Sequence, residues 1–361
     1  MKPRNIAIAC GVAGAAVGLA AATGIVYHKQ IKSAASLKRL TGYADGYDLY
    51  AIDIAYDYDL DRIIAAGVRD DQTYIDAVVA QVLPGVPAHV QAPQFACSAF
   101  VAVDAEGRVR TGRNYDFKDD TSALLVRNHP RDGYASIGFA ALNNLGDNTP
   151  LDSVAGRASA LMGPFAQLDG VNECGVSIAV LTLDSKPCDQ DTQRPVINTS
   201  LAIRLVLDRA ATTQEAVDLL SAYDMHAMAG RDYHFFITDA AGDARVVEWD
   251  PRDPDRAFKA TPVRQVTNFY ACYGDEVLPN QKNSELGHGK ERAIAIADVL
   301  DAHADAQDEA VAWKALRAAT QEPNPEDITS NTQWSVVFDN TEPAAAITLR
   351  RHWGDVDAFA L

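Results

Sequence analysis

The stretch FACSAFVAVDAEGRVRTGRNYDF (residues 95–117) decides the predicted fold, because it has the pattern of a β-hairpin. Ser98–Asp104 alternates and is rich in strand-forming residues, Ala105–Gly107 has the composition of a turn, and Arg108–Asn114 returns as a second strand. In a hairpin of this length, the start of the first strand lies beside the end of the second. The residues around position 97 and those around position 115 therefore meet at one end of the sheet.

That end of the hairpin holds three residues suited to nucleophilic catalysis, Cys97, Arg113 and Asp116. A thiol has a pKa of about 8.5, so it needs help to ionise at neutral pH, and a nearby guanidinium favours the thiolate. If Cys97 began a chain, its α-amine, with a pKa of about 7.7 to 8.0, would serve as general base and Asp116 would hold the ammonium. A core cysteine beside a surface ion pair leaves the same pattern, so both interpretations stand at this point.

The remaining segments predict a layered α+β architecture with mainly antiparallel sheets. Strands are expected at Leu49–Ile54, Ala123–Arg127, Ala135–Ala140 and Val176–Leu183, and in two hairpins that join His234–Thr238 to Ala244–Trp249 and Thr332–Phe338 to Ala344–Arg351. Helices are expected at Asp71–Leu83, Ser200–Ala210, after Thr212, at Lys290–Ala304 and at Asp308–Ala319. Residues 28–44 have the composition of a polar connector. No glycine-rich phosphate loop follows a predicted strand, so nucleotide chemistry has no support.

The composition is that of a folded soluble domain. The 361 residues include 32 Lys+Arg and 49 Asp+Glu, a net charge of −17, with 48 % hydrophobic residues. These values exclude a collagen, a low-complexity chain and a multi-span membrane protein, and they argue against a broad nucleic-acid surface. None of the five cysteines forms a CxxC pair, so a structural zinc site is not expected. Cys174 and Cys188 would be able to pair if the domain is exported; otherwise they are buried thiols.

The N-terminus has the pattern of a targeting or anchoring segment. Lys2 and Arg4 precede residues 6–27, a run without a charged side chain that is long enough to cross a bilayer. The run is interpreted as a signal anchor that stays, or as a signal peptide cleaved at the small residues 20–22. Both interpretations predict a location outside the cytoplasm, tethered to the membrane or secreted. A buried Ala/Gly helix is the third interpretation.

The spacing of Cys97, Arg113 and Asp116, with Gly-Arg-Asn-x-Asp around the arginine, resembles the choloylglycine hydrolase group. These are linear amide C–N hydrolases of the N-terminal-nucleophile (Ntn) class, which include bile salt hydrolases, penicillin V acylases and relatives of acid ceramidase. The segment DGVNECGV (residues 169–176) resembles the group's Gly-x-Asn-Glu-x-Gly stretch, and Val266–Asn268 resembles the segment with its oxyanion asparagine. Arg292 stands where the group has a second active-site arginine.

The resemblance implies a fold, an activity and a set of roles. The fold is the αββα sandwich, two antiparallel sheets between helical layers. Cys97 is the nucleophile that attacks the carbonyl of a small-molecule N-acyl amide, and its α-amine, oriented by Asp116, moves the proton to the leaving amine. Arg113 stabilises the thiolate, Asn268 donates to the oxyanion, and Arg292 adds positive charge. No cofactor and no metal take part.

Two features depart from the group's usual pattern. Bile salt hydrolases commonly have an asparagine ten residues beyond Asn172, whereas this chain has Thr182, which offers a backbone N–H and a hydroxyl. The second departure is the 96 residues before Cys97, which imply self-cleavage between Ala96 and Cys97. Residues 1–30 are then a signal peptide or anchor, residues 31–96 a connector and pre-nucleophile segment, and residues 97–361 the catalytic domain.

Three rival hypotheses remain at this stage. Cys97 would pair with His234 or His288 in a Cys–His hydrolase that needs no cleavage. Alternatively, the chain would be an envelope-tethered binding module on a decayed hydrolase fold. Within the family, the acyl group would pass to an amine instead of water. The acyl and amine specificities and the oligomeric state stay open.

Overall fold

The computed structural model describes residues 27–84, 96–146, 151, 153–280, 289–324, 326 and 331–361. Residues 6–26 of the uncharged run at 6–27, and His288, lie outside these described residues. Among the described residues, no helix is long and apolar enough to cross a membrane.

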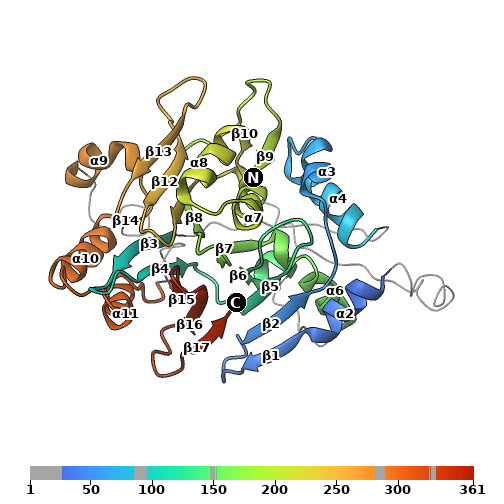
Figure 1. Ribbon diagram of the computed structural model, residues 1–361, viewed down its shortest axis with the longest axis horizontal. Coiled ribbons are helices and arrows are strands. Elements are labelled where there is room, and N and C mark those ends of the chain that lie inside the picture. Colours follow the sequence, from blue (N-terminus) through green and yellow to red (C-terminus); the bar gives the residue numbers. More distant parts are fainter. Residues whose placement is uncertain are drawn as a thin grey trace.

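Two large sheets form the centre of the molecule (Figure 1). The nine-stranded sheet runs, in order, through β1 (Lys38–Thr41), β2 (Leu49–Ile54), β5 (Ala123–Asn128), β6 (Ser136–Ala141), β7 (Gln167–Asn172), β8 (Ser177–Leu183), β11 (Asp232–Thr238), β12 (Ala244–Trp249) and β13 (Phe258–Pro262). The six-stranded sheet runs through β14 (Gln265–Val266), β3 (Ala96–Val103), β4 (Val109–Asp116), β15 (Thr332–Asp339), β16 (Ala344–Leu349) and β17 (Asp357–Ala360). Neighbouring strands in both sheets are antiparallel, except for the parallel pair β2–β5.

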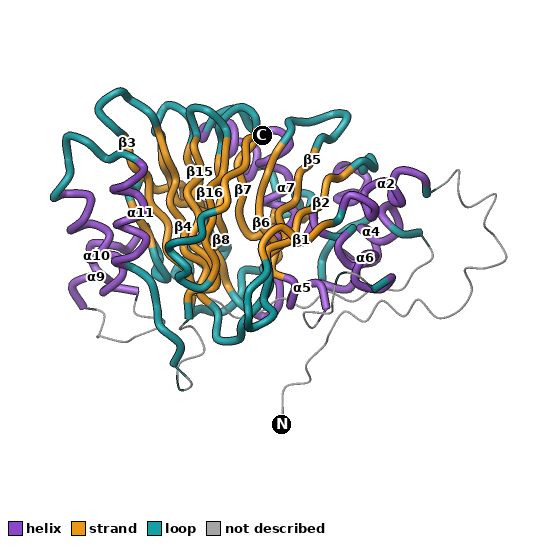
Figure 2. Tube along the Cα trace, turned by 90° about the horizontal axis from the view of Figure 1, so that it is seen from below, coloured by secondary structure: helices purple, strands orange, loops and turns teal. Residues whose placement is uncertain are grey.

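Helices cover the outer faces of the two sheets. Helices α7 (Thr199–Arg209) and α8 (Thr213–Ser221) pack on β7, β8, β11 and β12, while α10 (Gly289–Asp301) and α11 (Glu309–Ala318) pack on β3, β4 and β15. Figure 2 shows α10 and α11 beside the strands of the six-stranded sheet. This order of layers confirms the predicted α+β fold and the αββα sandwich.

Strand β3 shows how the sequence builds these layers. Successive side chains of a strand point to opposite faces. Cys97 and Ala99 point inward and join the core that includes residues of both sheets, whereas Phe100 and Ala102 point outward and pack with Ile296 and other apolar residues of α10 and α11. Both faces of β3 are covered, so seven of its eight residues are buried and its burial gives no alternating pattern.

The pre-nucleophile segment is an integral part of the large sheet. It forms α2 (His28–Ser36), β1, β2, α3 (Leu60–Ala65) and α4 (Asp71–Val82), and β2 extends the sheet by pairing with β5. Three tyrosine hydroxyls bind it to the rest of the chain: Tyr56 donates to the Leu161 carbonyl, Tyr58 to Asp208 at 2.9 Å, and Tyr74 to the Phe165 carbonyl at 2.8 Å. The segment is therefore held by main-chain pairing and by buried side chains.

Several local predictions are confirmed and others are corrected. The predicted strands Leu49–Ile54 and Ala244–Trp249 have the observed bounds, and Thr212 caps α8 by accepting from the Glu215 N–H at 3.1 Å. The prediction that residues 28–44 form a polar connector is wrong, because these residues contain α2 and β1. Helix α2 buries only Ser33 and so lacks an apolar stripe that would reveal it. The described cysteines are free, so Cys174 and Cys188 do not pair.

The remaining elements lie around the edges of the sandwich. They are α5 (Leu142–Gly146), α6 (Val154–Ala160), β9 (Val196–Asn198), β10 (Asp224–His226), α9 (Gly274–Asn280) and the 3-10 helices η1 (Gly163–Phe165), η2 (Met228–Gly230) and η3 (Ala271–Tyr273). Strands β9 and β10 form a separate parallel pair.

Candidate active site

The β3–β4 hairpin brings Cys97, Arg113 and Asp116 to one end of the six-stranded sheet. Cys97 lies opposite Tyr115, and Ala96 lies opposite Asp116. The guanidinium of Arg113 donates through Nη2 to Cys97 Sγ at 3.3 Å. All three predicted residues are fully buried. The hairpin register alone therefore places a cation within hydrogen-bond distance of the thiol.

Arg113 also joins the two sheets. Its Nη2 donates to the Val180 carbonyl on β8 at 3.1 Å, and its Nη1 lies 3.0 Å from Asp169 Oδ2 on β7. Asp169 accepts in addition from the indole N–H of Trp334 at 3.2 Å. Burial raises the pKa of the Asp169 carboxyl, and the Arg113 charge opposes this rise. Both charges of the pair have no solvent-exposed surface.

Asp169 is a site residue that sequence reasoning missed. It stands in the quoted segment DGVNECGV but had no role there. The available signal was a carboxylate within an otherwise uncharged strand, Gln167–Asn172, all of whose residues are buried. A charged group at such a position needs a partner, because an unpaired buried charge is costly.

The thiol of Cys97 is protonated in the continuous chain at neutral pH. Burial raises its pKa to about 12, while Arg113 and Arg292 oppose this rise and Asp116 adds to it. Arg113 therefore acts in the expected direction, but burial has the larger effect. Ionisation of this thiol at neutral pH therefore requires a base or contact with solvent.

Asn268 and Arg292 converge on the main chain of Cys97. The Cys97 N–H donates to Asn268 Oδ1 at 3.1 Å, Arg292 Nη2 donates to the same oxygen at 2.5 Å, and Arg292 Nη1 donates to the Cys97 carbonyl. With two donors on Oδ1, the amide nitrogen of Asn268 turns the other way and donates to the Thr182 carbonyl at 2.7 Å. The second hydrogen of this amide nitrogen has no hydrogen-bond partner among the described residues.

Thr182 enters the site through its main chain. Its carbonyl accepts from Asn268, whereas its buried hydroxyl has no hydrogen-bond partner among the described residues. A part for the Thr182 backbone N–H or hydroxyl toward a substrate stays a prediction. Because a carbonyl is common to all residue types, this contact does not depend on having threonine there.

Asp116 lies beside Arg292 at the same end. Arg292 Nη1 is 3.4 Å from Asp116 Oδ2, and the Thr332 hydroxyl donates to Asp116 Oδ1 at 2.6 Å. Burial raises the pKa of the Asp116 carboxyl, and Arg292 is the largest opposing influence. A crevice of about 510 Å³ between α10 and the segment after α11 reaches Arg292.

Asn172 of the quoted DGVNECGV segment has a structural part. Its amide nitrogen donates to the carbonyls of Leu207 and Ala210 at 3.1 and 2.7 Å, and its Oδ1 accepts from the Cys174 and Val176 N–H groups. It thereby fixes the β7–β8 turn to the end of α7.

The Cys–His alternative finds no support in the geometry. The buried His234 ring bonds through Nδ1 to Glu248 Oε2 at 3.2 Å. Among the described residues, no histidine nitrogen lies within hydrogen-bond distance of Cys97 Sγ. His288, the other candidate, lies outside the described residues.

Comparisons with known proteins agree with this arrangement. The family model for acyl-coenzyme A:6-aminopenicillanic acid acyl-transferase matches residues 103–352. Penicillin V acylase from Agrobacterium tumefaciens has a similar structure, with 20% identity over 73% of this chain and 86% of that chain and a TM-score of 0.53. A mutant conjugated bile acid hydrolase from Clostridium perfringens has 15% identity, coverage of 73% and 92%, and a TM-score of 0.57. A search of curated proteins found no match. The resemblance to the choloylglycine hydrolase group is confirmed, and the chain belongs to the acyl-coenzyme A:6-aminopenicillanic acid acyl-transferase family.

Proposed function

We propose that the protein hydrolyses a linear, non-peptide C–N amide bond of a small N-acyl substrate through a thioester on Cys97, after cutting itself between Ala96 and Cys97. One observation carries this proposal: the fully buried guanidinium of Arg113 donates to the Cys97 thiol, and the carboxylate of Asp169 neutralises the charge of Arg113. A buried ion pair is weak as a source of stability, because desolvation offsets its attraction. A cation kept there at this cost is well placed to stabilise a thiolate.

The groups around the Cys97 nitrogen support a later change from amide to amine. In the continuous chain this nitrogen has one hydrogen, which Asn268 Oδ1 accepts. After a cut it would become an ammonium with three hydrogens. Asp116 lies across the hairpin from Ala96 and supplies a carboxylate at that end of the strands. The site thus contains more acceptor capacity than an amide N–H requires.

Self-cleavage follows from these contacts by ordinary thiol chemistry. Cys97 Sγ attacks the Ala96 carbonyl carbon, the C–N bond breaks, and the thiol proton passes to the Cys97 nitrogen. Water then hydrolyses the thioester, which leaves a carboxylate on Ala96 and a free thiol on Cys97. Arg113 stabilises the sulfur anion both when it attacks the Ala96 carbonyl carbon and when hydrolysis of the thioester releases it.

Substrate turnover would repeat the same sequence. The α-amine of Cys97 accepts the thiol proton, the thiolate attacks the substrate carbonyl, and the amine of the substrate leaves with that proton. The free hydrogen of the Asn268 amide stabilises the oxyanion, a contact whose loss typically costs about 3 to 4 kcal/mol. Water releases the acyl group from the thioester.

The test is intact mass and N-terminal sequencing of active protein, together with assays on bile salts, penicillin V, N-acyl amino acids, fatty amides and acyl-homoserine lactones. We expect two fragments under denaturing conditions, the second beginning at Cys97. They should remain one particle under native conditions, because β2 is paired to β5. Full activity from a chain continuous through residues 96 and 97 would contradict the proposal.

Acyl transfer to an amine is the second candidate, and the matched family model favours it by its description. The two activities share the thioester and differ only in what attacks it. Product analysis with and without an added amine acceptor separates them. A new amide formed at the expense of the free acid would favour transfer.

A further inference from the structure

The segment that follows Asn268 is held by carboxylates of the opposite sheet. We define this Asn268 segment as residues 267–273; it follows β14 of the six-stranded sheet and ends in η3. Tyr270 donates its hydroxyl to Asp232, and Tyr273 donates its hydroxyl to Asp250 at 2.6 Å. Between these two contacts, Glu248 on β12 accepts hydrogen bonds from main-chain N–H groups of the segment rather than from a side chain.

Glu248 forms a clamp on the first turn of η3. Its Oε2 accepts from the Ala271 N–H at 3.0 Å and its Oε1 from the Cys272 N–H at 2.6 Å. His234 Nδ1 lies 3.2 Å from the same Oε2. Neither side chain has exposed surface. Burial by itself would raise the pKa of Glu248, but the His234 and Cys272 contacts lower it overall, so the carboxylate stays ionised at neutral pH.

We propose that Glu248 and His234 are positioning residues that fix the Asn268 amide against Cys97 and Thr182; this inference rests on the proposed function. Asn268 stands three residues before the clamped Ala271 and bridges the two sheets through the Cys97 N–H and the Thr182 carbonyl. The clamp connects the same two sheets, because Glu248 lies on β12 of the nine-stranded sheet and η3 follows β14 of the six-stranded sheet. A displacement of about 1 Å at a catalytic group costs on the order of 100-fold in rate.

Glu248→Gln is the first test, because it preserves shape while replacing one acceptor oxygen by an NH₂ group. That group would face an N–H donor of η3 and push the segment away. We expect kcat to fall about 10- to 100-fold, with KM within about twofold of wild type. Asp250→Asn is the matched control: it weakens a contact to the Tyr273 hydroxyl of the same segment and should leave kcat within about twofold.

A double-mutant cycle with Asn268→Ala shows whether Glu248 acts through Asn268. If it does, Glu248→Gln has no further effect on turnover in the Asn268→Ala background. Independent losses that multiply in the double variant would overturn the inference.

His234 is tested by two replacements. His234→Gln retains a donor toward Glu248 and should keep most of the activity, whereas His234→Leu should lower kcat as Glu248→Gln does. Equal activity of His234→Leu and wild type would overturn its positioning role. A wild-type chain that neither cuts itself nor hydrolyses any amide refutes the proposed function; an active wild type with an unaffected Glu248→Gln variant refutes the clamp alone.

Discussion

The two ends of the β3–β4 hairpin contain similar residue types in opposite surroundings. At the open end, the Arg113–Asp169 pair and Asp116 are buried beside Cys97. At the turn end, Arg110 pairs with Asp104 at 2.8 Å, and Arg108 pairs with Asp339 and Glu342. The same two strands thus have one ionic cluster at their open end, between the two sheets, and another at their turn end.

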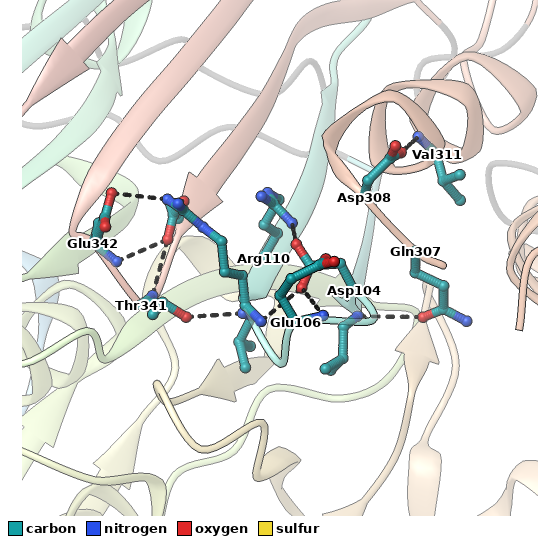
Figure 3. Close-up of polar contacts among 12 residues, drawn as sticks. Asp104, Glu106, Arg110, Gln307, Asp308, Val311, Thr341 and Glu342 are labelled. Carbon is teal, nitrogen blue, oxygen red and sulfur yellow. Dashed lines mark hydrogen bonds and ion pairs between the residues drawn. The ribbon is translucent and has the colours of Figure 1, made fainter. Parts of the chain in front are cut away.

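The turn-end cluster serves the local backbone (Figure 3). Asp104 Oδ1 closes the turn, because it accepts from the Glu106 and Arg108 N–H groups at 3.1 and 2.8 Å. Its Oδ2 accepts from the guanidinium of Arg110. The side chains of Arg108 and Glu342 are 38% and 74% exposed. Exposed pairs of this kind contribute little to stability and are screened by salt.

From this difference we expect the charges at the turn end to serve the fold and those at the open end to serve the proposed chemistry. At the turn end, the side chains of Arg108 and Glu342 are partly exposed to solvent, and Asp104 accepts from main-chain donors. The open-end groups lose their hydration, and each is neutralised by a partner from another strand or helix. Substitutions should therefore separate the two ends by their effect on turnover.

Cys97→Ala should give the largest effect, with neither self-cleavage nor turnover. Cys97→Ser should cut slowly, because a hydroxyl is the weaker nucleophile. Gel analysis under denaturing conditions and an amidase assay measure both. Residual cleavage of the alanine variant at residue 97 would remove the nucleophile from the open end.

Arg113→Gln should lower kcat by about 100- to 1,000-fold and also destabilise the protein by about 3 to 5 kcal/mol, since it leaves Asp169 buried without a counter-ion. The double variant Arg113→Gln/Asp169→Asn should recover most of the stability but none of the turnover. Denaturant unfolding and steady-state kinetics test this. Recovery of turnover in the double variant would show that Arg113 is needed only for folding.

The pH dependence of Cys97 alkylation should sharpen the contrast further. With a pKa of about 12 the thiol is protonated below that pH, and only the thiolate reacts. In the continuous chain, alkylation by iodoacetamide should therefore rise about tenfold per pH unit from pH 8 to pH 11. Mass spectrometry of the uncut fraction measures it, and a rate that levels off near pH 8 would contradict the buried thiol.

The smallest effect is expected at the turn end. Arg108→Met removes exposed ion pairs and should leave kcat unchanged, with a melting temperature within about 2 to 3 °C of wild type. Calorimetry and the same amidase assay serve as the readout. A loss of turnover similar to that of Arg113→Gln would erase the distinction between the two ends.

Local patterns were sufficient for much of the fold and for part of the site. Alternation and turn composition predicted the hairpin, and the hairpin register then brings Arg113 to Cys97 without any further knowledge. Asn268 and Arg292 entered by resemblance to a family, because nothing near them in the sequence points to residue 97.

Partners from the other sheet were missed for a physical reason. Asp169 and Glu248 belong to the nine-stranded sheet, and strand periodicity does not say which strands of two sheets face each other. Helix α2 was missed because tertiary contacts, not an apolar stripe, decide its conformation.

The distances along the chain between the contacts of Cys97 have a consequence for timing. Asn268 lies 171 residues and Arg292 lies 195 residues after Cys97, and Thr332, which binds Asp116, comes 216 residues after its partner. A nascent chain that has emerged only as far as residue 250 contains the scissile bond but none of these three groups. Such non-local sheets also form slowly. The proposed cut would therefore take place only after the last third of the chain has been synthesised and has folded.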